Sequence, residues 1–286
     1  MTPPPASPGT RGELRPVGVG VGVACTTVLL LTQAVRHGWL GPDVGSGAEF
    51  CELWHDGPLK QPVNTLSNLG FVAVGLAIAW AARRPEARGE GPLRRTTTVT
   101  LLVTVVVLLG PASAAMHATG TQVGRSLDLL SMHLVAGFAA AVAVVRLTGA
   151  THRLLAWFLA FVLVAQSAAL VPGGVPVVRQ PENLTFIALL LVVVVLESRA
   201  HRTGRSPTRT DRRWLAAALG TLALGFTLWN LDLHGWCRPD SWLQLHAVWH
   251  LLCALACWFL FRFYASERRS TPPTGGPATV TAALAE

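Results

Sequence analysis

Charged residues are scarce in this chain. Asp, Glu, Lys and Arg make up only 13% of its 286 residues, whereas 51% are hydrophobic and the mean hydropathy is +0.45. A soluble domain of this size carries roughly twice that charged fraction. The composition therefore excludes an ordinary soluble globular domain.

Three other features are also missing. The sequence has no internal repeat, and no basic surface interleaved with aromatic residues accompanies the net charge of +8 and the pI near 10.5, so a nucleic-acid partner is not expected. No small-x-small cleavage site follows the first apolar run, residues 17–35. We therefore expect a retained transmembrane helix there and not a signal peptide.

Long apolar runs take the place of these features. Segments such as TTTVTLLVTVVVLLG and FIALLLVVVVLE are too long and too purely apolar for strands or ordinary core helices. We predict an all-α, polytopic membrane bundle. Its eight spans are expected at about residues 17–35, 65–83, 97–117, 127–146, 153–171, 182–198, 213–232 and 242–263.

Basic residues are distributed unequally between alternate connections of the predicted bundle. Of the 23 Lys and Arg residues, 18 lie before the first span, in every second connection or at the end of the last span, and 5 lie in the other connections. The positive-inside rule then places both termini in the cytoplasm. Enrichment in Ala, Arg and Val is typical of GC-rich bacterial genomes, so the expected location is a bacterial plasma membrane.

Five polar residues stand where apolar sequence is expected. Ser113 and His117 lie near the outer end of the third span, Asp128 opens the fourth span on the same side, and His246 and His250 lie in the first two turns of the eighth. The i,i+4 spacing directs each pair along one helix face. Burying such groups in a membrane is costly unless they pair or bind something.

Three neutral imidazoles with an open fourth position are the ligand set of a catalytic zinc site. We therefore predict a metal site formed by His117, His246 and His250. Two histidines at i,i+4 also occur as haem ligands and in proton relays, and the spacing alone leaves these alternatives open. His133 lies five positions after Asp128, off its helix face, so we interpret it as a hydrogen-bonded packing residue.

Two cysteines lie in outer connections of the predicted topology. Cys51 is in the first and Cys237 in the last, both on the oxidising side. A disulfide between them would tether the outer loop to the helix that carries the histidine pair. Cys253 and Cys257, four apart inside the last span, are interpreted as small core residues.

Four separated motifs resemble one family. They are EFCE, then QPVNTLSNLGF, then SAAMH with an aspartate eleven positions after its histidine, and HAVWH near the C-terminus. The pattern, from about Glu49 to Tyr264, resembles the alkaline ceramidases and their wider superfamily of seven-helix membrane hydrolases, which includes the adiponectin-receptor-like proteins. The resemblance implies a seven-helix membrane domain over residues 40–265, with 17–35 as an added helix. The Pro-rich termini, residues 1–16 and 266–286, are expected to be disordered tails.

The resemblance also implies roles for the polar residues. His117, His246 and His250 would ligate zinc, Asp128 would orient and deprotonate the attacking water, and Ser113 would hydrogen-bond the substrate carbonyl as it becomes an oxyanion. The implied activity is zinc-dependent intramembrane hydrolysis of ceramide-like N-acyl lipids, which releases a fatty acid and a long-chain amine.

A calcium site just outside the first shared helix is a further property of the family. Glu49 and Glu52 match its acidic positions, and Phe50 and Trp54 stand where a backbone oxygen can serve. Gln61 departs from the pattern, because a carboxylate is expected there and its loss removes a charge from a hard-cation site. A solvated loop is the other interpretation of the two glutamates, so the calcium cofactor is left open.

Two other classes of function compete with hydrolysis. One is a receptor or scaffold that keeps a structural zinc, and the other is a transporter or redox protein that uses the histidines for protons or haem. Ser113 and Asp128 beside an open coordination position favour hydrolysis, because a structural zinc requires a fourth protein ligand and haem explains neither residue.

Overall fold

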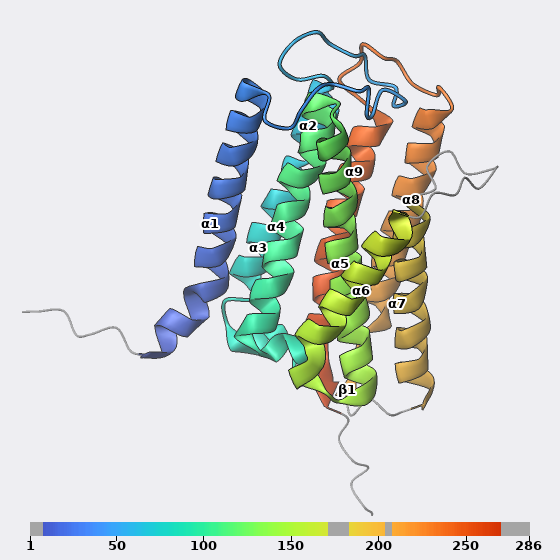
Figure 1. The fold of residues 1–286 in the computed structure, drawn as a ribbon. Coiled ribbons are helices and arrows are strands. Elements are labelled where there is room, and N and C mark those ends of the chain that lie inside the picture. The colour runs from blue at the N-terminus through green and yellow to red at the C-terminus, as the bar shows by residue number, and fades with distance from the viewer. Residues whose placement is uncertain (1–7, 171–182, 204–207, 270–286) are drawn as a thin grey trace, which may run out of the picture.

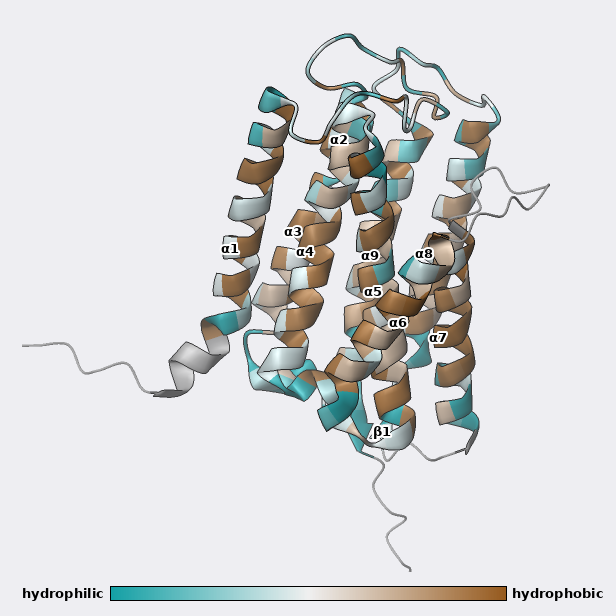
Figure 2. Cartoon of the chain, viewed as in Figure 1, coloured by the Kyte–Doolittle hydropathy of each residue, from teal (hydrophilic) through white to brown (hydrophobic). Residues whose placement is uncertain are grey.

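The computed structural model describes residues 8–170, 183–203 and 208–269 of the chain. Within these residues it is an all-helical bundle with eight helical segments long and apolar enough to span a membrane (Figure 1), so the predicted fold class is confirmed. Figure 2 shows apolar residues along the middle of the bundle and hydrophilic residues gathered towards its two ends. This distribution is that of an integral membrane protein, whose helices satisfy their own backbone groups inside lipid.

The helices follow the predicted spans. They are α1 Pro8–His37, α2 Pro62–Ser67 continued by α3 Leu69–Ala81, α4 Thr96–Thr119, α5 Gln122–Thr148, α6 Leu154–Ala169, α7 Asn183–Thr203, α8 Arg212–Leu233 and α9 Leu245–Ala265. Short 3-10 turns occupy Pro85–Arg88, Pro92–Arg94 and Thr151–Arg153. Two-residue strands, β1 Thr208–Arg209 and β2 Arg268–Arg269, pair antiparallel.

Both predicted tails are shorter than expected, because ordered residues extend into each of them. Helix α1 starts at Pro8, inside the predicted N-terminal tail, and proline is well tolerated at a first helical position because the N–H it lacks would be unpaired there. Glu267, in the predicted C-terminal tail, is buried and accepts a hydrogen bond from Arg146. The segments 1–7 and 270–286 of these tails lie outside the described residues.

Helices α4 and α5 form the centre of the bundle. Helix α4 packs against α1, α3 and α5, while α5 also packs against α6 and α7, and α9 packs against α3 and α8. Gly75 of α3 faces Val107 of α4 so closely that a Cβ atom there would lie 2.5 Å from the valine side chain. Small residues permit such approaches between membrane helices. The close packing brings α2 and α3 beside the end of α4.

The connections 38–61 and 234–244 cover one end of the bundle (Figure 1), which we call the site end. A disulfide joins Cys51 to Cys237 across these two connections, with a Cα–Cα distance of 6.3 Å. The backbone N–H of Leu53 donates to the carbonyl oxygen of Pro239 at 2.9 Å. Two segments far apart in sequence are thereby fixed over the same helix ends.

A buried ion cluster lies at the opposite end. The guanidinium of Arg146 in α5 pairs with Glu197 of α7 and, at 3.0 Å, with Glu267 just after α9. All three side chains are buried. Removing one member of such a buried cluster would leave an uncompensated charge away from water, which is strongly destabilising. The cluster therefore holds α5, α7 and the end of α9 together.

Candidate metal centre

Three histidines meet at the site end. His117 lies in the last turn of α4, and His246 and His250 lie in the first two turns of α9. All three are buried, and one ligand atom from each lies within 4.8 Å of those from the other two. The Nε2 atoms of His117 and His246 are 3.2 Å apart. Nitrogen ligands of a tetrahedral zinc with Zn–N bonds of about 2.0–2.1 Å lie about 3.3–3.4 Å apart, so this donor set fits a metal ion.

Hydrogen bonds hold two of the rings at Nδ1, and in His117 they favour metal binding through Nε2. The Nδ1 atom of His117 lies 2.8 Å from Oε1 of Gln61, an atom that only accepts. The Nδ1 atom of His250 lies 2.7 Å from Oγ of Ser67 and 3.3 Å from Nδ2 of Asn68. In His117 Nδ1 is therefore the protonated nitrogen, which leaves the lone pair on Nε2, whereas the hydroxyl and amide beside His250 are compatible with either tautomer of that ring. Metal-binding histidines are usually held by such a partner on the other ring nitrogen.

The third histidine is held by its backbone and its ring face. The N–H of His246 donates to Oδ1 of Asp232 at 3.3 Å, and Oδ2 of the same carboxylate accepts from the N–H of Cys51 at 2.9 Å. The ring of Phe50 stacks on the His246 ring with centroids 3.7 Å apart. The loop at the site end thus contacts the histidine cluster directly.

Gln61, Ser67 and Asp232 were not predicted as partners of the histidine cluster. Gln61, Asn64 and Asn68 recur at intervals of three and four in an apolar segment, which marks one polar helix face and was a usable signal. Asp232 is a lone carboxylate in an apolar span, which is costly without a partner and therefore also a signal.

Ser113 and Asp128 lie beside the histidine cluster. Ser113 is buried one turn before His117 on α4, and Asp128 lies in the second turn of α5. A side-chain hydrogen bond joins Ser113 to Asp128. The structure therefore brings together all five polar residues that the sequence singled out, from three helices.

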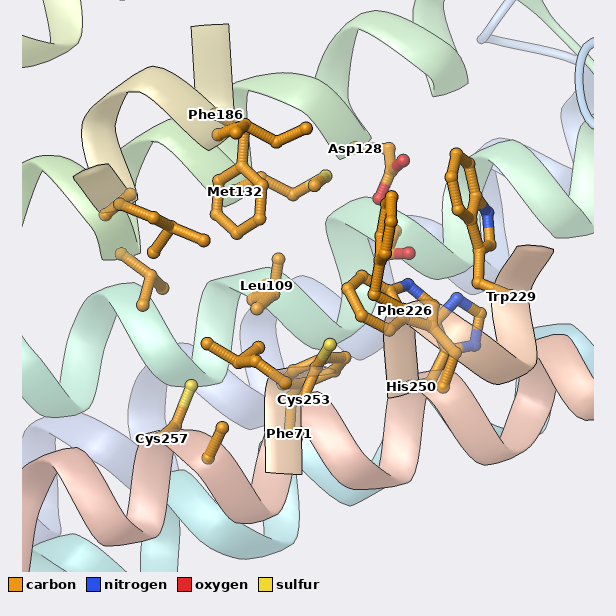
Figure 3. A pocket seen from close by; sticks show the side chains of 18 of the residues that line it. Phe71, Leu109, Asp128, Met132, Phe186, Phe226, Trp229, His250, Cys253 and Cys257 are labelled. Carbon is orange, nitrogen blue, oxygen red and sulfur yellow. The ribbon is translucent and has the colours of Figure 1, made fainter. Parts of the chain in front are cut away.

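A cavity of about 390 Å³ connects these residues to the apolar interior. Ser113, Asp128, His246 and His250 line its polar end. Figure 3 shows Asp128 and His250 on one side of the pocket and apolar side chains, among them Leu109, Met132, Phe186 and Cys257, towards the other. The volume is within the range of small-molecule sites, and a few convergent polar groups in an apolar lining are typical of them.

Two histidines and two cysteines outside the cluster have simpler environments. His133 is buried and its Nε2 lies 2.7 Å from Oγ1 of Thr185, the environment of a hydrogen-bonded packing residue. His55 is exposed in the loop. Cys253 and Cys257 belong to the hydrophobic core, as predicted, and both also line the cavity.

The residues expected at the calcium site have other partners. Glu52 is buried, and its Oε1 and Oε2 accept from the N–H groups of Val63 and Asn64 at 2.6 and 2.7 Å. Burial raises the pKa of Glu52, and the two backbone hydrogen bonds oppose that rise. The Oε2 of Glu49 accepts from the N–H of Gly47 at 3.0 Å. Glu52 is therefore not the solvated loop residue of the simpler interpretation, although Glu49 is exposed.

The tryptophan and phenylalanine of the same set are packing residues. The side chain of Phe50 stacks on the ring of His246. That of Trp54 packs over Gly120, where an added Cβ would lie 2.6 Å from the indole. The amide nitrogen of Gln61 is directed at backbone oxygens of the loop. An NH₂ donor at this position does not suit a divalent cation, which needs oxygen ligands.

The chain is an integral membrane protein whose bundle holds a buried three-histidine cluster, a candidate metal site, beside a hydroxyl and a carboxylate. The family model described as Ceramidase matches residues 45–272, and the chain belongs to the ceramidase family, as the sequence motifs predicted. No curated protein matches the sequence. Helix α1 lies outside the matched residues.

Proposed function

We propose that this protein is a zinc-dependent amide hydrolase that acts inside the membrane on ceramide-like N-acyl lipids. The products are a fatty acid and a long-chain amine. The observation that carries the proposal is that the histidine cluster and the Ser113–Asp128 pair face one largely apolar cavity. Membership of the ceramidase family supports an amidase activity.

Zinc suits the ligand set. Within the described residues the cluster contains three histidines, and three imidazoles leave a tetrahedral ion one position for water or substrate. Bound zinc supplies Lewis acidity, which lowers the pKa of a water molecule to about 7. His117 contributes an unprotonated Nε2 atom because Gln61 accepts its Nδ1 proton, and Ser67 holds the ring of His250 at Nδ1.

Asp128 and Ser113 perform the proton transfer and the charge stabilisation. Asp128 accepts a proton from the attacking water as the C–O bond forms, and it donates that proton to the leaving nitrogen as the C–N bond breaks. The hydroxyl of Ser113 donates a hydrogen bond to the carbonyl oxygen, which becomes negatively charged in the transition state. Their mutual hydrogen bond keeps both groups at the same end of the cavity.

The cavity and the helices around it suit a lipid substrate. Its apolar walls come largely from α5, α7, α8 and α9. Helix α7 packs on α5 and α6, whereas α8 packs on α9, so the two sides of the cavity are formed by separate sets of helices. A lipid tail enters laterally between α7 and α8. The excess of basic residues at the other end of the bundle supports an orientation with the site end on the outer side of the membrane.

A metal-binding receptor or scaffold of the same superfamily is the alternative. It accounts for the histidines, but it gives no role to a carboxylate and a hydroxyl that are hydrogen-bonded beside them in a cavity. Hydrolysis uses all five residues.

The test is a hydrolysis assay on a panel of N-acyl lipids. Purified protein is stripped with a chelator and then reloaded with zinc. We expect at least one ceramide-like amide to be cleaved, activity to disappear on stripping, and activity to return at about one zinc per chain. Protein that holds one zinc per chain and cleaves no member of the panel would favour the receptor.

A further inference from the structure

Gln61 connects the loop at the site end to the histidine cluster. Its side chain is fully buried. The Nε2 donates to the carbonyl oxygen of Gly47 at 2.9 Å and approaches that of Glu52 at 3.5 Å, while Oε1 lies 2.8 Å from Nδ1 of His117. One amide therefore joins two points of the loop and one imidazole.

The orientation of this amide is fixed by its partners. Backbone carbonyl oxygens only accept, so the NH₂ group must face Gly47 and Glu52, and the oxygen must face His117. Rotating the amide by half a turn would place oxygen against oxygen on the loop. The same orientation requires a proton on Nδ1 of His117, which is the tautomer that binds a metal through Nε2.

The loop backbone is shaped to meet the amide. Gly47 has a φ of +93°, in the region that favours glycine, and a Cβ added there would lie 3.4 Å from Oε1 of Gln61. The backbone N–H of Gln61 also donates to the carbonyl oxygen of His117 at 3.0 Å. Both the side chain and the main chain of Gln61 are thus bonded to this histidine.

A cation in this place would meet the wrong groups. A divalent ion requires oxygens, whereas the group between the carbonyls of Gly47 and Glu52 is an NH₂ donor. Both carboxylate oxygens of Glu52 are already bonded to N–H groups at the start of α2. Hydrogen bonds therefore supply the cross-links that a calcium ion would otherwise supply.

We propose that Gln61 is a positioning residue that replaces a divalent cation at this site. Its NH₂ group closes the loop at residues 47–52, and its carbonyl oxygen holds His117 in the metal-binding tautomer. The protein consequently needs no calcium for loop stability or for metal affinity. The inference rests on the metal site of the proposed function but not on the substrate.

The loop and the metal affinity are coupled through this residue. Phe50, three positions after Gly47, stacks on His246, so the segment that Gln61 closes covers a second ligand of the metal. Loss of the amide should therefore weaken zinc binding as well as loop stability, whereas a side chain that keeps only the acceptor should separate the two effects.

The test compares three variants of the full chain. Gln61→Leu removes both sets of hydrogen bonds, and Gln61→Glu keeps an acceptor for His117 but loses the donor to the loop. Gln244→Leu is the matched control, because buried Gln244 also donates through Nε2 to loop carbonyls, including Ser241 at 2.6 Å, but its side chain bonds no histidine. Zinc affinity is measured by competition with a chromogenic chelator, and thermal unfolding is followed in calcium-free buffer and in 1 mM calcium (about the level at which extracellular sites fill).

We expect calcium to leave the melting temperature of the unmodified protein unchanged. Gln61→Leu should lose about 10- to 100-fold in zinc affinity, the effect typical of removing a partner of a metal-binding histidine. Gln61→Glu should melt lower in calcium-free buffer yet keep most of the zinc affinity, and Gln244→Leu should melt lower with zinc affinity unchanged. A rise of several degrees in the unmodified protein on adding calcium would overturn the proposal, as would full zinc affinity in Gln61→Leu. Neither readout involves hydrolysis, so failure here is distinct from failure of the proposed activity.

Discussion

At the residue scale, the histidines of this protein divide into two kinds. His246 belongs to the buried cluster, with Nε2 facing another imidazole at 3.2 Å, whereas His133 is equally buried but its Nε2 lies next to a threonine hydroxyl. Burial alone therefore does not distinguish a metal ligand from a packing residue. The convergence of ring nitrogens does.

This difference predicts the metal content of two matched variants. His246→Ala should hold far less than one zinc per chain, because two imidazoles remain, whereas His133→Ala should keep about one. Elemental analysis of the folded, purified proteins gives both values. Full zinc in His246→Ala would show that the site has been misassigned.

The serine hydroxyl gives a second prediction at this scale. Ser113→Ala should lower turnover by about 10- to 1000-fold, mainly in kcat, because the hydrogen bond matters most when the oxyanion forms. Ser131→Ala is the control, since Ser131 is buried on α5 and donates to the backbone carbonyl of Asp128 at 2.7 Å. Steady-state kinetics per zinc-loaded molecule should show the large loss only at Ser113. Equal losses in both variants would point to a general packing effect.

At the scale of elements, the long apolar runs were enough to predict every span, since a run of this length in a membrane can only be a helix. The exact ends and breaks of the helices depended on contacts with residues distant in sequence. The predicted span 65–83 begins earlier, at Pro62, and breaks at Asn68, whose side chain donates to the carbonyl oxygen of Asn64 and lies 3.3 Å from Nδ1 of His250. No local pattern reveals a contact between residues 182 positions apart.

The disulfide is an element-scale tether with a measurable effect. It closes a segment of 186 positions, and removing such a cross-link typically costs about 2–4 kcal/mol of stability. We expect Cys51→Ser combined with Cys237→Ser to lower the melting temperature by several degrees while zinc binds at saturating concentration. Cys25→Ser, which changes an exposed free cysteine of α1, should have no effect. An unaltered melting temperature in the double variant would mean that the loop is held by its hydrogen bonds alone.

At the scale of the whole molecule, the histidine site was predicted from the depth at which its residues lie in the membrane spans. Ser113, His117, Asp128 and the histidine pair were assigned to one membrane layer from span boundaries, and the structure places them around one cluster and cavity. The Gln61 and Asp232 contacts could not be predicted in the same way, because they depend on how the loop folds back over the helix ends. Glu267 was misplaced in a tail for a similar reason, since its partner Arg146 lies 121 positions earlier.

Membrane orientation is the next prediction at this scale. In a Cys25→Ser background, Asp56→Cys at the site end should react with an impermeant thiol reagent in intact cells, and Glu86→Cys at the opposite end should react only after permeabilisation. Both positions are exposed in loops. The reason is the excess of Lys and Arg in the connections at the end that carries Glu86. The reverse labelling pattern would place the site end in the cytoplasm.

The turnover of Asp128→Asn per zinc-loaded molecule is the most direct test of the proposed hydrolysis. Asparagine keeps the shape of the side chain but cannot accept the proton, so amide hydrolysis should fall by about 100-fold or more while zinc content, measured on the same sample, stays near that of the unmodified protein. Unchanged turnover in zinc-loaded Asp128→Asn would contradict the mechanism and favour the receptor.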